Sequence, residues 1–155
     1  MNIAIATLAA LALAVPAATM TGDKSTVIPA GDVKAAITKL VPQAQASGSS
    51  GSTLATTGNL ALKLSVRTSS GGAEIHAHYD DLMIVEQGSA TLITGGTVIG
   101  GTTSADGETH GSGIEGGVRK TISVGDVVIV PAGQPHQLLI PTGTVYAAMV
   151  AKIKE

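Results

Sequence analysis

Three histidines stand at spacings that suit a metal site. His76 and His78 are separated by one residue, and residues two apart on a β-strand project from the same face. His136 follows a strand-like run over residues 127–130 and a Pro/Gly turn, so it begins the next apolar run. Neutral imidazoles bind Zn, Fe, Ni, Cu and Mn. We therefore expect these three histidines to hold one divalent transition metal ion, with the choice among these five metals left open.

Each of these features also has a plainer interpretation. A His-x-His pair on a strand is often a hydrogen-bonded surface pair. The residues Pro131-Ala132-Gly133 are turn residues whatever the function. The combination of the histidine pair with the Pro-x-Gly-x-x-His segment favours the metal site over both alternatives.

The composition excludes several classes of protein. The chain has 155 residues, of which 44% are hydrophobic and 13% are charged, as in a single globular domain. Cysteine is absent, which excludes disulfides, thiolate nucleophiles, Cys-ligated zinc and iron–sulfur clusters. A net charge of −2 and only two aromatic residues, both tyrosine, argue against a nucleic-acid partner.

The N-terminus resembles a secretory signal. Residues 3–15 are an apolar run that is too short for a membrane span of about 20 residues, and Ala17 and Ala18 offer small residues for cleavage. We expect residues 1–17 to be a signal peptide and the protein to be periplasmic or secreted, with no stable membrane span. No Lys or Arg precedes the run, so an uncleaved anchor or a buried N-terminal helix stays an open alternative.

The next segment, residues 18–59, is predicted to hold a short helix and a connector. Residues 32–40 have apolar side chains at helical spacing. Asp32 can cap the start of this helix, and the pre-proline position Val41 favours its end. Residues 42–59 are rich in Gln, Ala, Ser, Gly and Thr without periodicity, so we expect a flexible connector there.

From residue 60 to residue 155 the pattern predicts a β domain. Apolar and polar residues alternate over 60–67 and 145–153, and short strand-like runs recur between glycine and proline turns. Gln87-Gly88, between two of these runs, is predicted to join a hairpin. Many short strands of this kind are typical of a sandwich or a closed barrel. The strands are predicted at residues 60–67, 73–78, 82–85, 90–93, 127–130 and 145–153.

Two segments carry a resemblance to the cupin superfamily. Residues 125–136 match its second motif: a glycine, five residues, Pro-x-Gly, two residues and a histidine. Residues 71–88 are similar to its first motif, in which a histidine pair is followed by an acidic residue and a hairpin glycine. The resemblance covers residues 60–153 and implies an all-β jelly-roll barrel, the double-stranded β-helix. It also implies that His76, His78 and His136 are the metal ligands.

The acidic ligand of the first motif has no residue at its usual place. Cupins carry it four or five residues after the second histidine, where this chain has Leu82 and Met83. Asp81 keeps the usual separation from Gly88 and is the best substitute. If Asp81 does not reach, Asp80, Glu74, Gln134 or water would complete the coordination.

Other polar residues are candidates for binding substrate or supporting the ligands. Arg67 and Glu74 lie on predicted strands and Gln134 in the second motif; a solvated strand face or an ion pair is the plainer interpretation of the first two. The glycine-rich insertion at residues 95–117 carries His110. It is expected to cross the barrel mouth or to extend a sheet edge. There His110 would be a further ligand or acid/base group, or an exposed loop histidine.

The resemblance implies a small metal-dependent enzyme acting on a small organic molecule, of dioxygenase, isomerase or lyase type. No catalytic residue is assigned from the sequence. A non-catalytic exported ligand-binding or structural cupin is the alternative, because the regular glutamate and an obvious general base are both missing. Cupins commonly pair through strand edges, so the resemblance also implies a homodimer.

Overall fold

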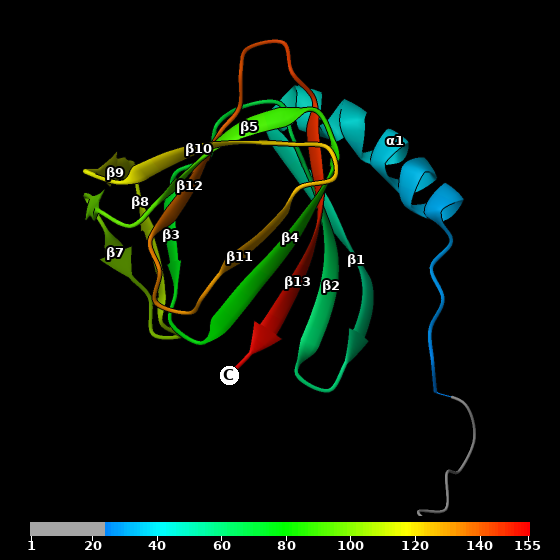
Figure 1. Ribbon diagram of the computed structural model, residues 1–155, viewed down its shortest axis with the longest axis horizontal. Helices are drawn as coiled ribbons and strands as arrows, with labels where there is room; N and C mark the ends of the chain where they lie inside the picture. Colours follow the sequence, from blue (N-terminus) through cyan, green and yellow to red (C-terminus); the bar gives the residue numbers. More distant parts are fainter. Residues whose placement is uncertain (1–23) are drawn as a thin grey trace, which may run out of the picture.

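A computed structural model describes residues 24–155, which form two facing antiparallel β-sheets with one helix packed outside them (Figure 1). The predicted signal peptide, residues 1–17, lies outside the described residues. Within residues 24–155, no helix is long and apolar enough to cross a bilayer. The elements are α1 (Ala30–Ser47), β1 (Ser49–Thr57), β2 (Leu60–Arg67), β3 (Ala73–His76), β4 (Tyr79–Gln87), β5 (Ser89–Thr94), β6 (Thr97–Ile99), β7 (Thr102–Thr103), β8 (Glu108–Gly111), β9 (Gly113–Glu115), β10 (Val118–Ser123), β11 (Val127–Val130), β12 (His136–Leu139) and β13 (Tyr146–Lys154).

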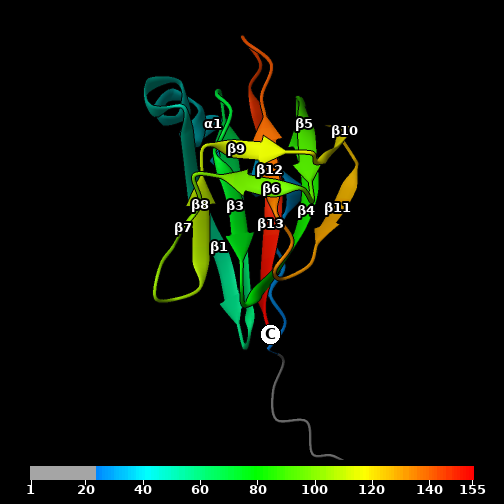
Figure 2. The same ribbon diagram turned by 90° about the vertical axis from the view of Figure 1, so that its left-hand side faces the viewer.

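The strand order brings distant parts of the sequence together. One sheet has the order β1-β2-β13-β4-β11, and the facing sheet has the order β10-β5-β12-β3-β8-β7. A small β6-β9 pair lies across the strands of the second sheet, in front of β3 and β12 in Figure 2. Because β12 lies between β5 and β3, the second histidine motif is placed directly beside the first. The predicted all-β barrel is confirmed.

Strand alternation divides the apolar residues between two cores. On β2, Leu64 and Val66 are buried and pack with Val33 and Ile37 of α1 on the outer face of the first sheet. The residues between them face the barrel interior. A second core lies between the sheets, and Tyr146 is its largest fully buried side chain. Each well-buried aliphatic side chain contributes about 1.5–3 kcal/mol to folding, so α1 is held mainly by this packing.

The helix is longer than the sequence predicted. It begins at Ala30 and passes through Pro42 before ending at Ser47. A proline in a helix interior removes one hydrogen bond and costs about 3 kcal/mol, but the last turn buries Ala44 completely against the sheet. Gly48 then ends the helix with a left-handed φ of 86°, its N–H donating to the carbonyl of Ala44. Tertiary packing therefore outweighs the proline signal.

The predicted connector at residues 42–59 also has regular structure. After α1 it forms β1, which pairs antiparallel with β2 along its length. The expectation of a flexible connector was wrong here because β1 is an edge strand whose residues are mostly exposed or half-buried. A strand of that kind needs no apolar alternation, so its sequence carries no period-2 signal.

Gln87 and Gly88 do not join a hairpin. β4 and β5 belong to opposite sheets and share no ladder, so the connection carries the chain from one sheet to the other. Gly88 has a φ of 71°, and a Cβ there would lie 2.4 Å from the carbonyl oxygen of Val145. The glycine is required by this close approach and by the left-handed backbone. A hairpin and a sheet crossing produce the same pattern of two apolar runs around a glycine.

The insertion at residues 95–117 extends a sheet edge, which was one of its two expected roles. It forms β6 to β9, and β8 pairs with β3 in register from His76↔Glu108 to Ala73↔Gly111. β7 then adds to the outside of β8. The pairing places residues of the insertion beside the histidine of β3.

Candidate metal centre

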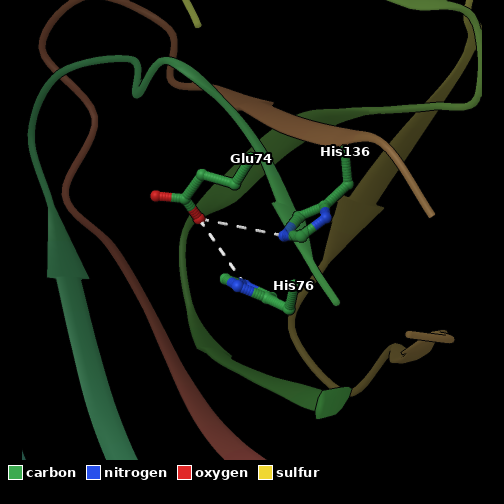
Figure 3. A group of neighbouring side chains, drawn as sticks. All are labelled: Glu74, His76 and His136. Atoms are coloured by element: carbon green, nitrogen blue, oxygen red, sulfur yellow. Dashed lines mark ion pairs between the residues drawn. The ribbon is translucent and has the colours of Figure 1, made fainter. Parts of the chain in front are cut away.

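The site lies where β3 and β12 meet. Glu74 and His76 are two apart on β3, and His136 is the direct cross-strand partner of Glu74. All three side chains therefore project from one face of the sheet. Figure 3 shows the Glu74 carboxylate pointing between the two rings, with its Oε2 3.9 Å from His76 Nε2 and 3.8 Å from His136 Nε2. One donor atom from each residue lies within 4.8 Å of the others, a grouping that could hold a metal ion.

Both imidazoles are held through the nitrogen that faces away from this group. His76 Nδ1 hydrogen-bonds the carboxylate of Glu108, and His136 Nδ1 donates to the carbonyl oxygen of Gln134 at 3.1 Å. With the proton on Nδ1, each ring presents the lone pair of Nε2 to the same point. Metal-binding histidines are typically oriented in this way by a carboxylate or carbonyl behind the ring.

Asp81 on β4 brings a second carboxylate to the group from the facing sheet. Its Oδ2 lies 3.4 Å from His76 Nε2, and its Oδ1 accepts a hydrogen bond of 2.9 Å from Lys152 Nζ. The side chain is 9% exposed. Asp81 is thus close enough to add to the donor set, and Lys152 neutralises its charge.

Burial and neighbouring charges shift the pKa values at the site. Burial lowers the pKa of His76, but hydrogen bonds to the Asp81 and Glu108 carboxylates outweigh it and the net pKa is raised. Burial dominates at His136, whose pKa is lowered. Burial raises the pKa of Asp81, yet its bonds to His76 and Lys152 bring the net value below the ordinary one. His136 is therefore the imidazole more readily kept neutral for ligation.

His78 is the one predicted ligand that the structure does not bring to this group. β3 ends at His76 and the chain bends at residues 77 and 78, so strand alternation does not continue to His78. Its side chain is exposed and lies against the turn at Gly107. The expectation that residues two apart on a strand project from the same face holds instead for Glu74 and His76. The sequence does not show that the strand ends after the first histidine.

The other predicted residues are divided between the site and its surroundings. Arg67 lines the same cavity as Glu74 and His76. Gln134 contributes its main-chain carbonyl to His136, while the residue lines a separate cavity between β10 and β11. His110 is on β8 with a side chain 63% exposed, and its Nδ1 is 4.0 Å from Glu74 Oε1. His110 thus lies at the rim of the site.

Glu108 and Lys152 are functional candidates that the sequence analysis missed. Both act through a neighbour, Glu108 on His76 and Lys152 on Asp81. The alternation Glu108-Thr109-His110 is compatible with a strand, but nothing in the sequence shows that this strand pairs with β3. Lys152 stands on a strand that was predicted, but the alternation over residues 145–153 places it opposite the apolar residues, and that apolar face packs against α1 rather than in the barrel.

The group opens into a cavity of about 260 Å³ in the barrel. This volume lies just below the range of about 300–1,000 Å³ that is common for ligand pockets, so it suits a small molecule. The walls include the apolar Met83, Leu138 and Ala148. Two neutral imidazoles with one or two carboxylates also match a donor set that transition metals favour. The residues present therefore fit a bound metal with a small ligand beside it.

Comparison with known proteins supports the fold. No protein-family model and no curated protein matches the sequence. Among solved structures, the DMSP lyase DddQ from Ruegeria pomeroyi is similar with a TM-score of 0.50 and 16% identity, over 69% of this chain and 47% of that one. This chain thus spans about half the length of that lyase.

Two further structures have the same architecture. A protein with a double-stranded β-helix domain from Klebsiella pneumoniae aligns with a TM-score of 0.51 and 15% identity, over 68% of this chain and 76% of that one. The polyketide cyclase RemF from Streptomyces resistomycificus aligns with a TM-score of 0.51 and 14% identity, over 70% and 66% of the two chains. At these identities the likeness shows the fold, and the chain therefore has the cupin fold, the double-stranded β-helix that its two histidine motifs predicted.

Proposed function

We propose that this protein binds one divalent transition metal ion through Glu74, His76 and His136, with Asp81 as a fourth ligand. The observation that carries the proposal is the pairing of the two imidazoles, each held at Nδ1 and presenting Nε2 to one carboxylate. Iron, manganese, zinc, nickel and copper all suit this donor set.

With the metal bound, we infer a metal-dependent enzyme that transforms a small organic molecule in the cavity. The metal would supply a Lewis acid able to polarise a carbonyl or hydroxyl oxygen of the substrate. Of the three chemistries expected from the sequence, isomerase or lyase reactions are favoured over a dioxygenase reaction. Support comes from the same fold in a lyase, a polyketide cyclase and a putative mannose-6-phosphate isomerase.

The chain's own residues supply groups for proton transfer. Glu74 Oε2 faces the two imidazoles, and no Lys or Arg among the described residues is paired with this carboxylate, so Glu74 Oε1 is the candidate general base. The Lys152 ammonium, 2.9 Å from Asp81, is the candidate acid on the opposite wall.

A non-catalytic ligand-binding protein is the second candidate function. It is favoured by one observation: Asp81 is hydrogen-bonded to Lys152, and Glu108 is hydrogen-bonded to His76. Glu74 is then the one carboxylate of this group that is available for proton transfer. A metal with a filled coordination sphere would then have a structural role.

The test is the metal content of the full chain purified without added metal. Wild-type protein is expected to hold about one equivalent, and a His76→Ala, His136→Ala double variant is expected to lose it. His78→Ala is the matched control, because His78 is exposed outside the group, and it should keep its metal. Equal metal in the wild type and the double variant would overturn the site, whereas loss in His78→Ala would restore His78 as a ligand.

We also propose export, on the signal-like residues 1–17 alone. Expression of the full chain in a bacterium, followed by fractionation and N-terminal sequencing, tests this. A mature chain beginning near Ala18 in the periplasm or medium is expected, and an intact cytoplasmic chain would contradict it.

A further inference from the structure

The cavity has a second polar end, formed by Arg67 and Tyr146. The two residues are direct partners in the β2–β13 ladder, so their side chains leave the same face of the sheet. Both line the cavity that holds Glu74, His76 and His136. The cavity is thus flanked by two groups of polar side chains, one on each sheet.

Both side chains at this end lack a protein partner. The Tyr146 hydroxyl is fully buried and has no hydrogen-bond acceptor or donor among residues 24–155. Arg67 is half-buried and forms no ion pair with any carboxylate in the same range. Buried polar groups in native proteins are nearly always satisfied, so an unpartnered hydroxyl beside an unpaired guanidinium indicates a ligand.

The backbone is shaped to hold the guanidinium there. A Cβ at position 71 would lie 2.7 Å from Arg67 Nη1, so any residue larger than glycine would displace the guanidinium. The carbonyl oxygen of Gly71 is itself taken by Gln137 Nε2 at 2.9 Å. Gly71 therefore allows the guanidinium to lie close to the chain, while its carbonyl bonds elsewhere.

The donors at this end match an anionic oxygen ligand. A guanidinium offers parallel N–H donors that fit a carboxylate in bidentate geometry. Burial raises the pKa of Tyr146 to about 12 even though Arg67 opposes the shift, so the hydroxyl stays protonated and can donate a further hydrogen bond.

The other charged residues of the cavity leave the end formed by Arg67 and Tyr146 as the favoured place for an anion. The other charged residues that line the cavity are Lys63, Glu74, Asp81 and Lys152. Lys152 neutralises Asp81, and the negative charge of Glu74 lies at the metal group rather than beside Arg67. Arg67 is thus an unneutralised positive charge within the cavity.

We propose that Arg67 and Tyr146 bind the carboxylate of a small organic acid, whose apolar body lies along Met83, Leu138 and Ala148 and whose far end reaches the Glu74–His76–His136 group. The assignment names the substrate class of the function proposed above and rests on it. Binding of the carboxylate itself needs no metal, so the two proposals can fail separately.

The test is calorimetric titration of the full chain, freed of metal with a chelator, using butanoate and its neutral analogue butanamide. Wild-type protein is expected to bind butanoate at millimolar concentrations and butanamide at least about 10-fold more weakly. Arg67→Met should weaken butanoate binding about 10- to 100-fold, and Tyr146→Phe about 3- to 10-fold. Arg119→Met removes the same charge from an exposed position on β10 and should leave binding unchanged.

Arg67→Lys guards against a folding defect in Arg67→Met. Arg67→Lys keeps the positive charge and the aliphatic part of the side chain but loses the paired N–H donors of the guanidinium. We therefore expect an affinity for butanoate between those of the wild type and Arg67→Met, with a circular dichroism spectrum that matches the wild type. Fluorescence of a Tyr79→Phe variant, in which Tyr146 is the sole tyrosine and no tryptophan is present, should change as butanoate binds.

Three results would overturn the inference. They are the absence of saturable butanoate binding, equal binding of butanoate and butanamide, and undiminished binding in a folded Arg67→Met. Metal content is measured separately, on wild-type protein purified without chelator or added metal. If that protein holds no metal while the chelated protein still binds butanoate through Arg67, the metal site is refuted and the carboxylate site is kept. If butanoate binds only after metal is added back, and Arg67→Met does not weaken it, the carboxylate site is refuted and the metal site is kept.

Discussion

Glu74 and His136 form the only paired position between β3 and β12, and their side chains meet with Oε2 3.8 Å from Nε2. This pair brings the histidine of β12 beside the Glu74 and His76 side chains of β3. Glu74→Ala removes an acceptor that both imidazoles face, and a missing ligand carboxylate should weaken metal affinity about 10- to 100-fold or more, by comparison with losses of supporting groups. Competition with a chromophoric chelator measures this.

Glu74→Gln is the matched variant for charge. It keeps an oxygen donor but removes the negative charge, so it should fall between the wild type and Glu74→Ala. Glu115→Ala, on β9 and exposed, controls for a general loss of negative charge. Wild-type affinity in Glu74→Ala would assign the carboxylate ligand to Asp81 alone.

Much of the fold could be predicted from the sequence because its inner strands alternate. β2 buries Leu64 and Val66 on one face, and this produces a clear period of two. β1 lies at an edge and α1 contains Pro42, so local preference gives the wrong answer for both. In these segments packing against β2 decides the structure.

The candidate site could be predicted from the sequence only in part. His76 and His136 follow from the two motifs, but the choice between Glu74 and His78 as the neighbour of His76 depends on where β3 ends. Glu108 depends on the pairing of β8 with β3, a contact across more than 30 residues of sequence. Pairing at that distance is set by tertiary structure and leaves no local pattern.

Breaking the Asp81–Lys152 pair should destabilise the metal-free protein. The carboxylate would stay buried without its cation, which costs about 3–5 kcal/mol for a fully buried pair. Because Lys152 keeps 19% of its side chain exposed, we expect about 2 kcal/mol for Lys152→Met at neutral pH. Chemical denaturation measures the loss, with Lys154→Met at the exposed end of the same strand as the control.

The same pair predicts how stability depends on acid. The pKa of Asp81 is lower in the folded chain than its ordinary value, so its contribution is present above that ordinary value and is lost as pH falls through the folded one. In Lys152→Met the folded pKa of Asp81 should rise towards the ordinary value, and the acid loss of stability should therefore shrink. An acid limb identical to that of the wild type would show that Lys152 does not stabilise the charged form.

The raised pKa of Tyr146 predicts how the stability of the protein changes at alkaline pH. Its folded pKa is about 12, raised by burial, whereas an unfolded tyrosine titrates near 10. Since the folded value is the higher one, the unfolded chain loses the proton first, and stability should fall as pH rises from about 10 towards 12. In a Tyr79→Phe background, absorbance of the single phenolate should appear near 12 or together with unfolding; ionisation near 10 in the folded protein would contradict the buried environment.

Removing the Tyr146 hydroxyl should separate stability from binding. The hydroxyl is buried without a partner among residues 24–155, and an unsatisfied buried polar group costs about 1–3 kcal/mol. Tyr146→Phe should therefore raise the free energy of unfolding by about 1 kcal/mol while weakening carboxylate binding. If the hydroxyl had a purely structural role, its removal would lower the stability of the protein. Thermal unfolding of Tyr146→Phe therefore distinguishes a structural role from a ligand-binding role.

The two sheet edges at β10 and β11 predict the oligomeric state. Val118, Val127 and Ile129 are 60%, 61% and 68% exposed there, and each strand ends its sheet with one side unpaired. Exposed edges with apolar side chains favour pairing with another strand, as the expected homodimer requires. Ile129→Lys should convert a dimer to monomer by sedimentation velocity, because the charge would be buried in the contact. Val27→Lys, at a residue 83% exposed before α1, should leave the dimer intact, and a wild type that sediments as a monomer would refute the edge contact.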